Sequence, residues 1–348
     1  MRKPKIALIA AENATREIGG VERLYLGMRD AINARGAACD IVNVPSNESN
    51  IDEIKRSYLR FYDLDLSAYD CVISTKAPSY AARHRIHICY LVHTMRVFYD
   101  MFEQEFRRPS EQLLEHRSLI HQLDTAALSD RRIRCRFAVG EQVRSRLLDF
   151  NGLNSEVLRH PTTLTNFRRG KFEYILLPGR LHRWKRVDLV INAMQYVQSD
   201  IKLVISGTGE QELALRRAAR GDDRIIFVGR VTDDRLIELY ADALAVAFVP
   251  VREDLGLVTL EAFHSSKPVI TCRDSGEPAR LVRDGESGFV CAADPQEIAT
   301  RINELRDDPD RARRMGEAGA AFATTIRWDA VAKRLLGAVE LDWCTDGV

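Results

Sequence analysis

The chain of 348 residues contains 51 lysine and arginine residues against 50 aspartate and glutamate residues, and 45% of its residues are hydrophobic. This length predicts about two globular domains. The balanced charge argues against a nucleic-acid-binding protein, which needs an excess of basic side chains. The sequence has no apolar run of about 18 residues, so no membrane-spanning helix is expected.

The first segment is a short apolar run, residues 5–11, which meets Glu12 and Asn13 without a small-residue cleavage site. This pattern favours a buried β-strand over a secretory signal. The seven cysteines are scattered singly and form no C-x-x-C pair, as in chains that stay in a reducing compartment. We therefore expect a cytoplasmic protein.

Short apolar runs alternate with helical patterns through the first half of the chain. A strand at 5–11 is followed by an amphipathic stretch at 21–35 that ends before Gly36. Runs that are apolar on both faces and separated by helices predict a parallel sheet covered by helices on both sides. The later strands expected in this half are 39–44, 71–75, 88–93 and 137–139.

The same alternation starts again after a polar stretch at 160–172. Helical patterns at 187–197, 211–221 and 234–243 lie between apolar runs. The strands expected here are 173–179, 201–207, 224–229, 244–250, 268–272 and 287–291.

These two series predict an α/β protein with two doubly wound, Rossmann-like domains, residues 1–160 and 161–327. The last segment, 328–348, carries apolar residues at helical spacing from Trp328 onward. We expect this helix to pack back on the first domain. An ordinary last helix of the second domain is the alternative.

Ligands of open α/β sheets bind beyond the carboxyl ends of the strands, so the residues after each strand are the candidates. Gly19 and Gly20 follow the first strand and allow close approach of an anion to a helix N-terminus, although a simple turn explains them equally well. The segment GTGEQE, 207–212, opens like a dinucleotide fingerprint but lacks its third glycine. A tight turn into the following helix is the favoured interpretation.

Two cations follow the strand expected at 173–179. Arg180 ends that strand and Lys185 lies near the next helix start, so the pair could neutralise a diphosphate without a metal ion. A solvated basic turn, which would also contain Arg183 and Arg186, is an equal alternative.

The stretch VREDLGLVTLEAFHSSKPVI, 251–270, places two carboxylates around a helix start. The first-turn amides of Gly256, Leu257 and Val258 have no acceptor within the helix and can bind phosphate or sugar oxygens. Glu253 in the loop and Glu261 in the helix can accept hydrogen bonds from diols. Two solvated glutamates would be the alternative for an isolated pair.

Taken together, these motifs resemble the retaining glycosyltransferases of family 4, the glycosyl transferases group 1. The resemblance rests on Arg180 and Lys185, FVGRV at 227–231, Glu253 and Glu261, and the segment 275–290. It implies the GT-B fold, in which two Rossmann-like domains face each other across a cleft. Two residues depart from the family pattern. Leu255 replaces a usual Phe, and Glu277 replaces a frequent second Gly and is expected to reshape the donor-sugar pocket.

The resemblance implies transfer of a hexose from a nucleoside-diphosphate sugar with retention of configuration and without a metal or other cofactor. The acceptor would be a hydroxyl of a saccharide, glycoconjugate or lipid-linked molecule. The segment 91–100 is similar to mannosyltransferases of surface polysaccharide biosynthesis, which favours GDP-mannose slightly over a UDP-hexose.

Residue roles also follow from the resemblance. Arg180 and Lys185 would bind the donor diphosphate and stabilise its departure, Glu253 would bind the transferred sugar, and Glu261 the ribose. The two carboxylates are therefore not expected to act as the acid and nucleophile of a glycosidase.

In the same way, backbone groups around Val228 and Arg230 would bind the nucleobase. The Gly19–Gly20 loop would cover phosphate and sugar. His93, at a strand end, would belong to the sugar site, whereas without the resemblance a structural histidine is favoured there.

Other functions remain open. A metal-dependent transferase would need a D-x-D motif, which Asp63-Leu64-Asp65 matches. A nucleotide-sugar epimerase or hydrolase shares the fold type, and a non-catalytic nucleotide-sugar-binding protein is a further alternative.

Three basic stretches of the first domain, 82–87, 105–117 and 130–136, could contact anionic lipid at the inner face of the membrane or a lipid-diphosphate acceptor. Solvated helix faces of mixed charge are the favoured interpretation.

Overall fold

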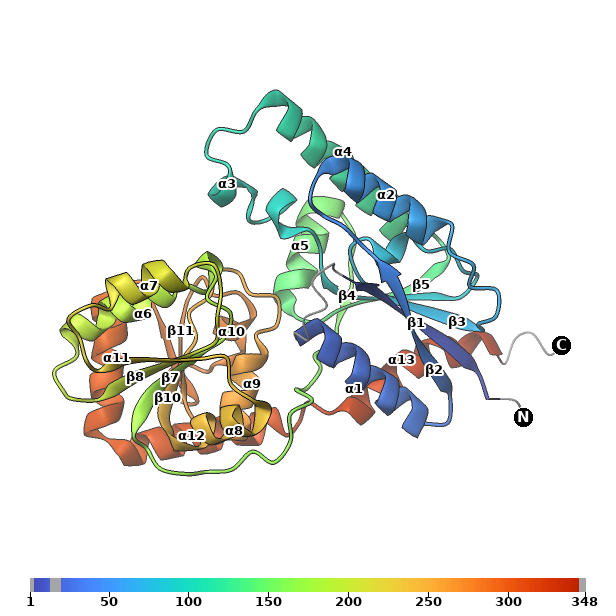
Figure 1. Ribbon diagram of the computed structural model, residues 1–348. Coiled ribbons are helices and arrows are strands. Elements are labelled where there is room, and N and C mark those ends of the chain that lie inside the picture. The colour runs from blue at the N-terminus through green and yellow to red at the C-terminus, as the bar shows by residue number, and fades with distance from the viewer. Residues whose placement is uncertain (1–2, 13–19, 344–348) are drawn as a thin grey trace. The chain divides into compact units, whose positions relative to one another are not determined.

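The computed structural model describes residues 3–12 and 20–343 and divides into two compact units (Figure 1). Unit 1 comprises Met1–His160 and Arg327–Val348, and unit 2 comprises Pro161–Ile326. Within the described residues, each unit contains one six-stranded sheet whose paired strands are all parallel. Unit 2 ends one residue before the boundary expected from the sequence.

The sheet of unit 1 has the order β2-β1-β3-β4-β5-β6. β3 is buried along its whole length and β1 at all but its two end residues, as expected for strands covered by helices on both faces. The edge strand β6 has only two residues, so the apolar pattern of the sequence does not reveal it. The strands are β1 (Lys5–Glu12), β2 (Ala38–Pro45), β3 (Cys71–Lys76), β4 (His87–His93), β5 (Ile133–Ala138) and β6 (Glu156–Val157).

Helices cover the sheet of unit 1, and two of them begin at residues that cap their free amides. Asn50 caps α2 and Ser110 caps α4 through side-chain oxygens. The helices are α1 (Gly20–Ala34), α2 (Ile51–Tyr62), α3 (Phe102–Glu105), α4 (Glu111–Leu128), α5 (Glu141–Asn151) and α13 (Trp328–Trp343), with 3-10 turns η1 (Ser79–Ala81) and η2 (Arg96–Phe98).

The last helix, α13, packs against α1. Val331, Ala332 and Leu335 are buried on its apolar stripe. Its first residue, Trp328, stacks on His160 with ring centroids 5.2 Å apart. Burial of this stripe explains why the chain returns to unit 1 after completing unit 2.

A buried polar cluster lies in the core of unit 1. The carboxylate of Asp124 on α4 accepts hydrogen bonds from the hydroxyls of Tyr58, Tyr80 and Tyr99 and is fully buried. Burial raises the pKa of Asp124 to about 6, although the three hydroxyls oppose this rise.

The sheet of unit 2 has the order β12-β11-β10-β7-β8-β9. From β7 the chain adds β8 and β9 on one side of the sheet, and it then adds β10, β11 and β12 on the other side. Successive side chains of β7 enter different apolar clusters, Ile175 and Leu177 on one face and Leu176 on the other. The strands are β7 (Tyr174–Pro178), β8 (Lys202–Ser206), β9 (Ile225–Gly229), β10 (Ala243–Ala247), β11 (Val269–Cys272) and β12 (Gly288–Cys291).

Two of the three helices predicted for unit 2, those at 187–197 and 211–221, are longer in the sequence pattern than in the structure. The helix expected at 187–197 ends at Ala193 and continues as a 3-10 turn, and the strand expected at 244–250 ends at Ala247. The elements are α6 (Val187–Ala193), α7 (Glu212–Ala218), α8 (Asp233–Asp242), α9 (Leu257–His264), α10 (Glu277–Leu281), α11 (Pro295–Asp307) and α12 (Pro309–Ala323), with η3 (Arg183–Lys185) and η4 (Met194–Tyr196).

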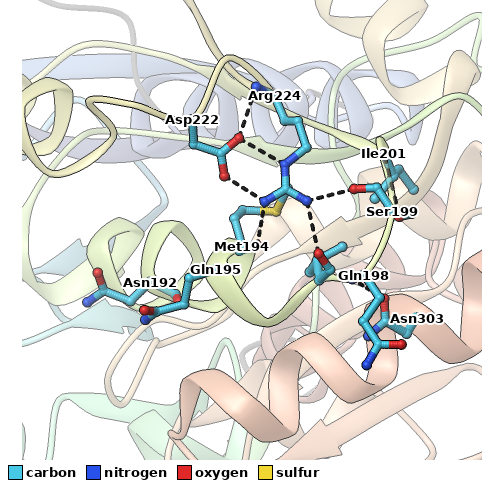
Figure 2. Close-up of polar contacts among 10 residues, drawn as sticks. Asn192, Met194, Gln195, Gln198, Ser199, Ile201, Asp222, Arg224 and Asn303 are labelled. Atoms are coloured by element: carbon cyan, nitrogen blue, oxygen red, sulfur yellow. Dashed lines mark hydrogen bonds and ion pairs between the residues drawn. The ribbon is translucent and has the colours of Figure 1, made fainter.

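A charged cluster around Arg224 holds the segments that precede β8 and β9 (Figure 2). Its guanidinium pairs with Asp222 at 2.7 Å and donates to the carbonyls of Met194, Val197 and Ser199 at 2.6–3.0 Å. Because it precedes the strands, this cluster lies at the opposite sheet edge from the loops that follow them. Its role is structural.

Candidate functional site

The candidate site of unit 2 lies at the carboxyl ends of β7 and β10. These neighbouring strands mark the position where the strand order reverses, and doubly wound sheets bind ligands at this position. The loops 179–186 and 248–256 follow these two strands, and the loop 273–276 follows β11.

Arg186 ties these three loops together. Its Nε donates to the carbonyl of Val249 at 2.7 Å, one Nη donates to that of Pro250 at 2.8 Å, and both Nη atoms contact Asp274 at 2.7 Å. The residue adopts a left-handed conformation, with φ of 50°. The interpretation of 180–186 as a solvated basic turn is therefore wrong for Arg186, although Arg183 is exposed.

Lys185 and Glu253 form an ion pair at the centre of this edge. The Lys185 Nζ lies 2.7 Å from Glu253 Oε2, and their side chains are only 25% and 19% exposed. The Glu253 backbone is held on both sides, since its N–H donates to Ser275 O at 2.8 Å and its carbonyl accepts from Glu277 N at 2.9 Å. A cation and a carboxylate are thus presented together from two loops.

The start of α9 has no room for a side chain. Gly256 caps the helix with φ of +74°, and a Cβ on it would lie 2.7 Å from Pro278 Cγ and 2.9 Å from Phe248 Cε1. The next residues, Leu257 and Val258, form the first turn, whose amides have no acceptor within the helix. The geometry at this position therefore requires glycine and directs these amides out of the helix end.

Glu261 is buried inside α9 and is 8% exposed. Its Oε1 accepts from the Thr162 hydroxyl at 3.0 Å, and its Oε2 accepts from the Tyr240 hydroxyl at 2.8 Å. The alternative of two solvated glutamates is therefore wrong. Sequence analysis missed Thr162 and Tyr240, because neither belongs to a motif.

Arg180 points to a different neighbour from Lys185. Its side chain is 72% exposed and lies 3.5 Å from Glu210, which also faces His182 at 3.4 Å. Thus the two predicted cations share the loop after β7, but in this structure each is paired with a different carboxylate.

The glycines of the segment 207–212 are explained by packing. A Cβ on Gly207 would lie 2.0 Å from Gly179 O, and one on Gly209 would lie 2.4 Å from Leu181 O. The backbone of this turn lies directly on the loop after β7, which agrees with the tight-turn interpretation rather than with a dinucleotide fingerprint.

The remaining candidates of unit 2 lie at the carboxyl end of β9 and after β11. Val228 is 37% exposed near the end of β9, Gly229 follows with φ of 67°, and Arg230 is exposed. Glu277 begins α10 with a fully buried side chain. The preceding Gly276 has φ of +77°, and a Cβ there would lie 2.6 Å from the backbone of Glu253.

The candidates of unit 1 lie at the end of β4, at the start of α1 and after α2. His93 ends β4, is partly buried, and has its Nδ1 2.7 Å from the Thr94 carbonyl. Gly20 is the first residue of α1, and Gly19 lies outside the described residues. In the D-x-D triplet, Asp65 accepts the backbone N–H of Ser67 at 3.0 Å, as in an Asx turn.

Within residues 3–12 and 20–343, no three His, Cys, Asp or Glu side chains gather as metal ligands would. In the same part of the chain, no helix combines the length and hydropathy that crossing a bilayer requires.

The sequence of unit 2 is similar to sequences of known proteins. Residues 165–322 match the family model described as glycosyl transferases group 1. This match lies within unit 2. Curated relatives include the D-inositol 3-phosphate glycosyltransferases of Corynebacterium diphtheriae, 29% identical over 170 residues, and Streptomyces scabiei, 34% identical over 173 residues. Each alignment covers 45% of this chain, and the chain spans only 40% and 39% of these two relatives.

Solved structures extend the likeness to both units. Sucrose-phosphate synthase from Thermosynechococcus elongatus aligns with a TM-score of 0.80 at 18% identity, covering 98% of this chain and 100% of that one. HepE of Anabaena, solved with UDP and glucose, aligns with a TM-score of 0.73 at 15% identity, covering 97% and 99%. At this identity the likeness shows the fold alone, and it confirms the predicted α/β class and GT-B fold.

Proposed function

We propose that the chain is a retaining, metal-independent hexosyltransferase of family 4 that uses a nucleoside-diphosphate sugar. The observation that carries the proposal is the Lys185–Glu253 pair, 2.7 Å apart beside the first turn of α9, within the segment that matches glycosyl transferases group 1. This arrangement offers positive groups for a leaving diphosphate beside a carboxylate for sugar hydroxyls.

In the proposed reaction, the bond between the sugar and the diphosphate breaks and negative charge grows on the leaving oxygen. In this proposal, Lys185 Nζ and the amides of Leu257 and Val258 bind the leaving diphosphate and stabilise the charge that develops on it. The donor phosphate helps to remove the acceptor proton as the acceptor attacks from the side of the leaving group, which retains the anomeric configuration. Arg180 joins the diphosphate by exchanging its exposed contact with Glu210.

The other roles extend from this centre. Glu253 accepts hydrogen bonds from the transferred sugar, Glu261 binds the ribose, and backbone groups around Val228 and Arg230 bind the base. We assign His93 and the Gly19–Gly20 loop to the sugar and phosphate as a further part of the proposal. Glu277, buried next to the Glu253 loop, changes the shape of the sugar pocket.

The donor is a UDP-hexose or GDP-mannose. Structures of HepE contain UDP, glucose and UDP-glucose, which supports UDP-hexoses as the first to test. The curated relatives are named for D-inositol 3-phosphate, which supports a hydroxyl acceptor; we propose a saccharide, glycoconjugate or lipid-linked molecule.

We place the protein in the cytoplasm, since the six cysteines among the described residues are free thiols. We also propose peripheral contact with the inner membrane face through the basic stretches of unit 1 and the exposed side chains of Leu59, Tyr62 and Leu114. Sedimentation with anionic liposomes tests this contact. If the protein does not pellet with the liposomes, or if salt does not reduce the pelleting, the proposed membrane contact is excluded.

The decisive experiment offers the purified protein a panel of UDP- and GDP-sugars with acceptors in the presence of EDTA. We expect glycosyl transfer with retained configuration and protection against heat by one nucleoside diphosphate. Donor consumption without an acceptor product would favour the epimerase or hydrolase, and protection without turnover would favour the non-catalytic binding protein. Absence of both turnover and protection would exclude the proposal.

A further inference from the structure

The carboxylate of Glu261 is held by two donors from separate parts of unit 2. Thr162 approaches Oε1 from the second residue of the unit, and Tyr240 approaches Oε2 from α8. Both donors are buried, Thr162 at 6% and Tyr240 at 0% exposure.

This arrangement fixes the plane of the carboxylate. A glutamate side chain has several rotatable bonds, and one hydrogen bond leaves it free to rotate about the contact. Donors on both oxygens remove that freedom and compensate for taking the charge out of water. Burial and the neighbouring carboxylate raise the pKa of the Tyr240 hydroxyl, so it remains a donor.

The Thr162 hydroxyl is itself oriented by its own segment. Its oxygen accepts the backbone N–H of Leu164 at 3.2 Å, which leaves the hydroxyl hydrogen for Glu261. Side chains that hold a binding residue in place in this way are needed where geometry must be kept to a fraction of an ångström.

We infer that Thr162 and Tyr240 are positioning residues that hold Glu261 for the two ribose hydroxyls of a nucleoside diphosphate. The inference rests on the proposed function and deepens it. A carboxylate accepts hydrogen bonds on two oxygens, which match the two hydroxyls of a vicinal diol. The consequence is selectivity for ribonucleotides over 2′-deoxyribonucleotides, and this selectivity depends on the Thr162 hydroxyl.

The test measures binding of UDP and GDP, each beside its 2′-deoxy analogue, by calorimetry. For the nucleotide that binds, we expect the intact protein to prefer the ribose form by about tenfold. Thr162→Val should reduce this preference to about threefold or less by weakening binding of the ribose form alone, and Thr162→Ser should restore it. Tyr240→Phe should act in the same direction as Thr162→Val.

Tyr174→Phe is the matched control. The Tyr174 hydroxyl donates to Leu239 O at 3.0 Å, so its loss removes a partly buried tyrosine hydrogen bond without touching Glu261. This variant should keep the full ribose preference. Thermal unfolding of each variant separates loss of fold from loss of selectivity, and Thr162→Ser covers the case in which valine prevents folding.

Failures of the two proposals are distinguishable. If neither UDP nor GDP binds the intact protein, the proposed function fails and the positioning role falls with it. If a nucleotide binds and folded Thr162→Val keeps the full preference, or if Thr162→Ser loses it as valine does, only the positioning role is overturned.

Discussion

Replacing Arg186 with methionine should loosen the loops that hold the Lys185–Glu253 pair. Methionine keeps a Cβ and a long apolar stem, so the strain of the left-handed backbone, φ 50°, is the same in both proteins. The comparison therefore isolates the guanidinium, which bonds two carbonyls and one carboxylate.

The size of the effect follows from these contacts. Each bond from a charged donor to a loop carbonyl contributes about 1.5 kcal/mol or more. The ion pair adds little, because Asp274 is 52% exposed and water screens it. We expect Arg186→Met to lower the free energy of unfolding of unit 2 by about 3 kcal/mol. For a unit of this size, such a loss lowers the melting temperature by roughly 6–12 °C.

Thermal unfolding and nucleotide binding are measured on the same samples. Arg183→Met is the control, because Arg183 is exposed in the same turn. Its melting temperature should stay within about 2 °C of the parent. Arg186→Lys should fall between the two, since an ammonium group cannot match the forked contacts. A melting temperature for Arg186→Met equal to that of Arg183→Met would refute the structural role of this residue.

Three further outcomes are expected. Lys185→Ala should lower kcat by about 10²–10³ in a protein that still folds, because a donor to the leaving group is lost; near-normal kinetics would remove Lys185 from the site. Gly256→Ala should destabilise unit 2 by about 1–3 kcal/mol in denaturant titrations, since alanine is strained at φ +74° and meets Pro278; unchanged stability would contradict this crowding. The pKa of Asp124, raised from 3.8 to about 6, makes its protonated form the one that folding favours. The contribution of Asp124 to the stability of the fold is therefore complete below pH 3.8 and is lost as the pH rises through about 6. Between pH 4 and pH 7, the free energy of unfolding of the parent should fall by about 3 kcal/mol more than that of Asp124→Asn. Parallel profiles of stability against pH for the two proteins would contradict this prediction.

Local patterns were sufficient for much of the fold. The apolar runs at 71–75 and 173–179 became β3 and β7, because strands buried on both faces are apolar throughout. Element ends were less predictable. The strand expected at 137–139 begins at Ile133, since arginines alternate with its buried residues and interrupt the apolar run.

The candidate site was only partly accessible to such reasoning. Glu253, Gly256 and Glu261 lie close together in the sequence, so their spacing around a helix start could be recognised. Arg186 looked like one more solvated cation, and Thr162 belonged to an unremarkable polar segment. Their roles depend on partners elsewhere in the chain.

The sequence by itself determined the alternation of strands and helices and the position of the glycines, because both follow from side-chain size and polarity over a few residues. The tertiary structure decided which residues meet. Lys185 and Glu253 are 68 positions apart, and Thr162 and Glu261 are 99 apart. Contacts over such separations follow from the placement of β10 beside β7 and from the path of the chain into unit 2, which no local periodicity records.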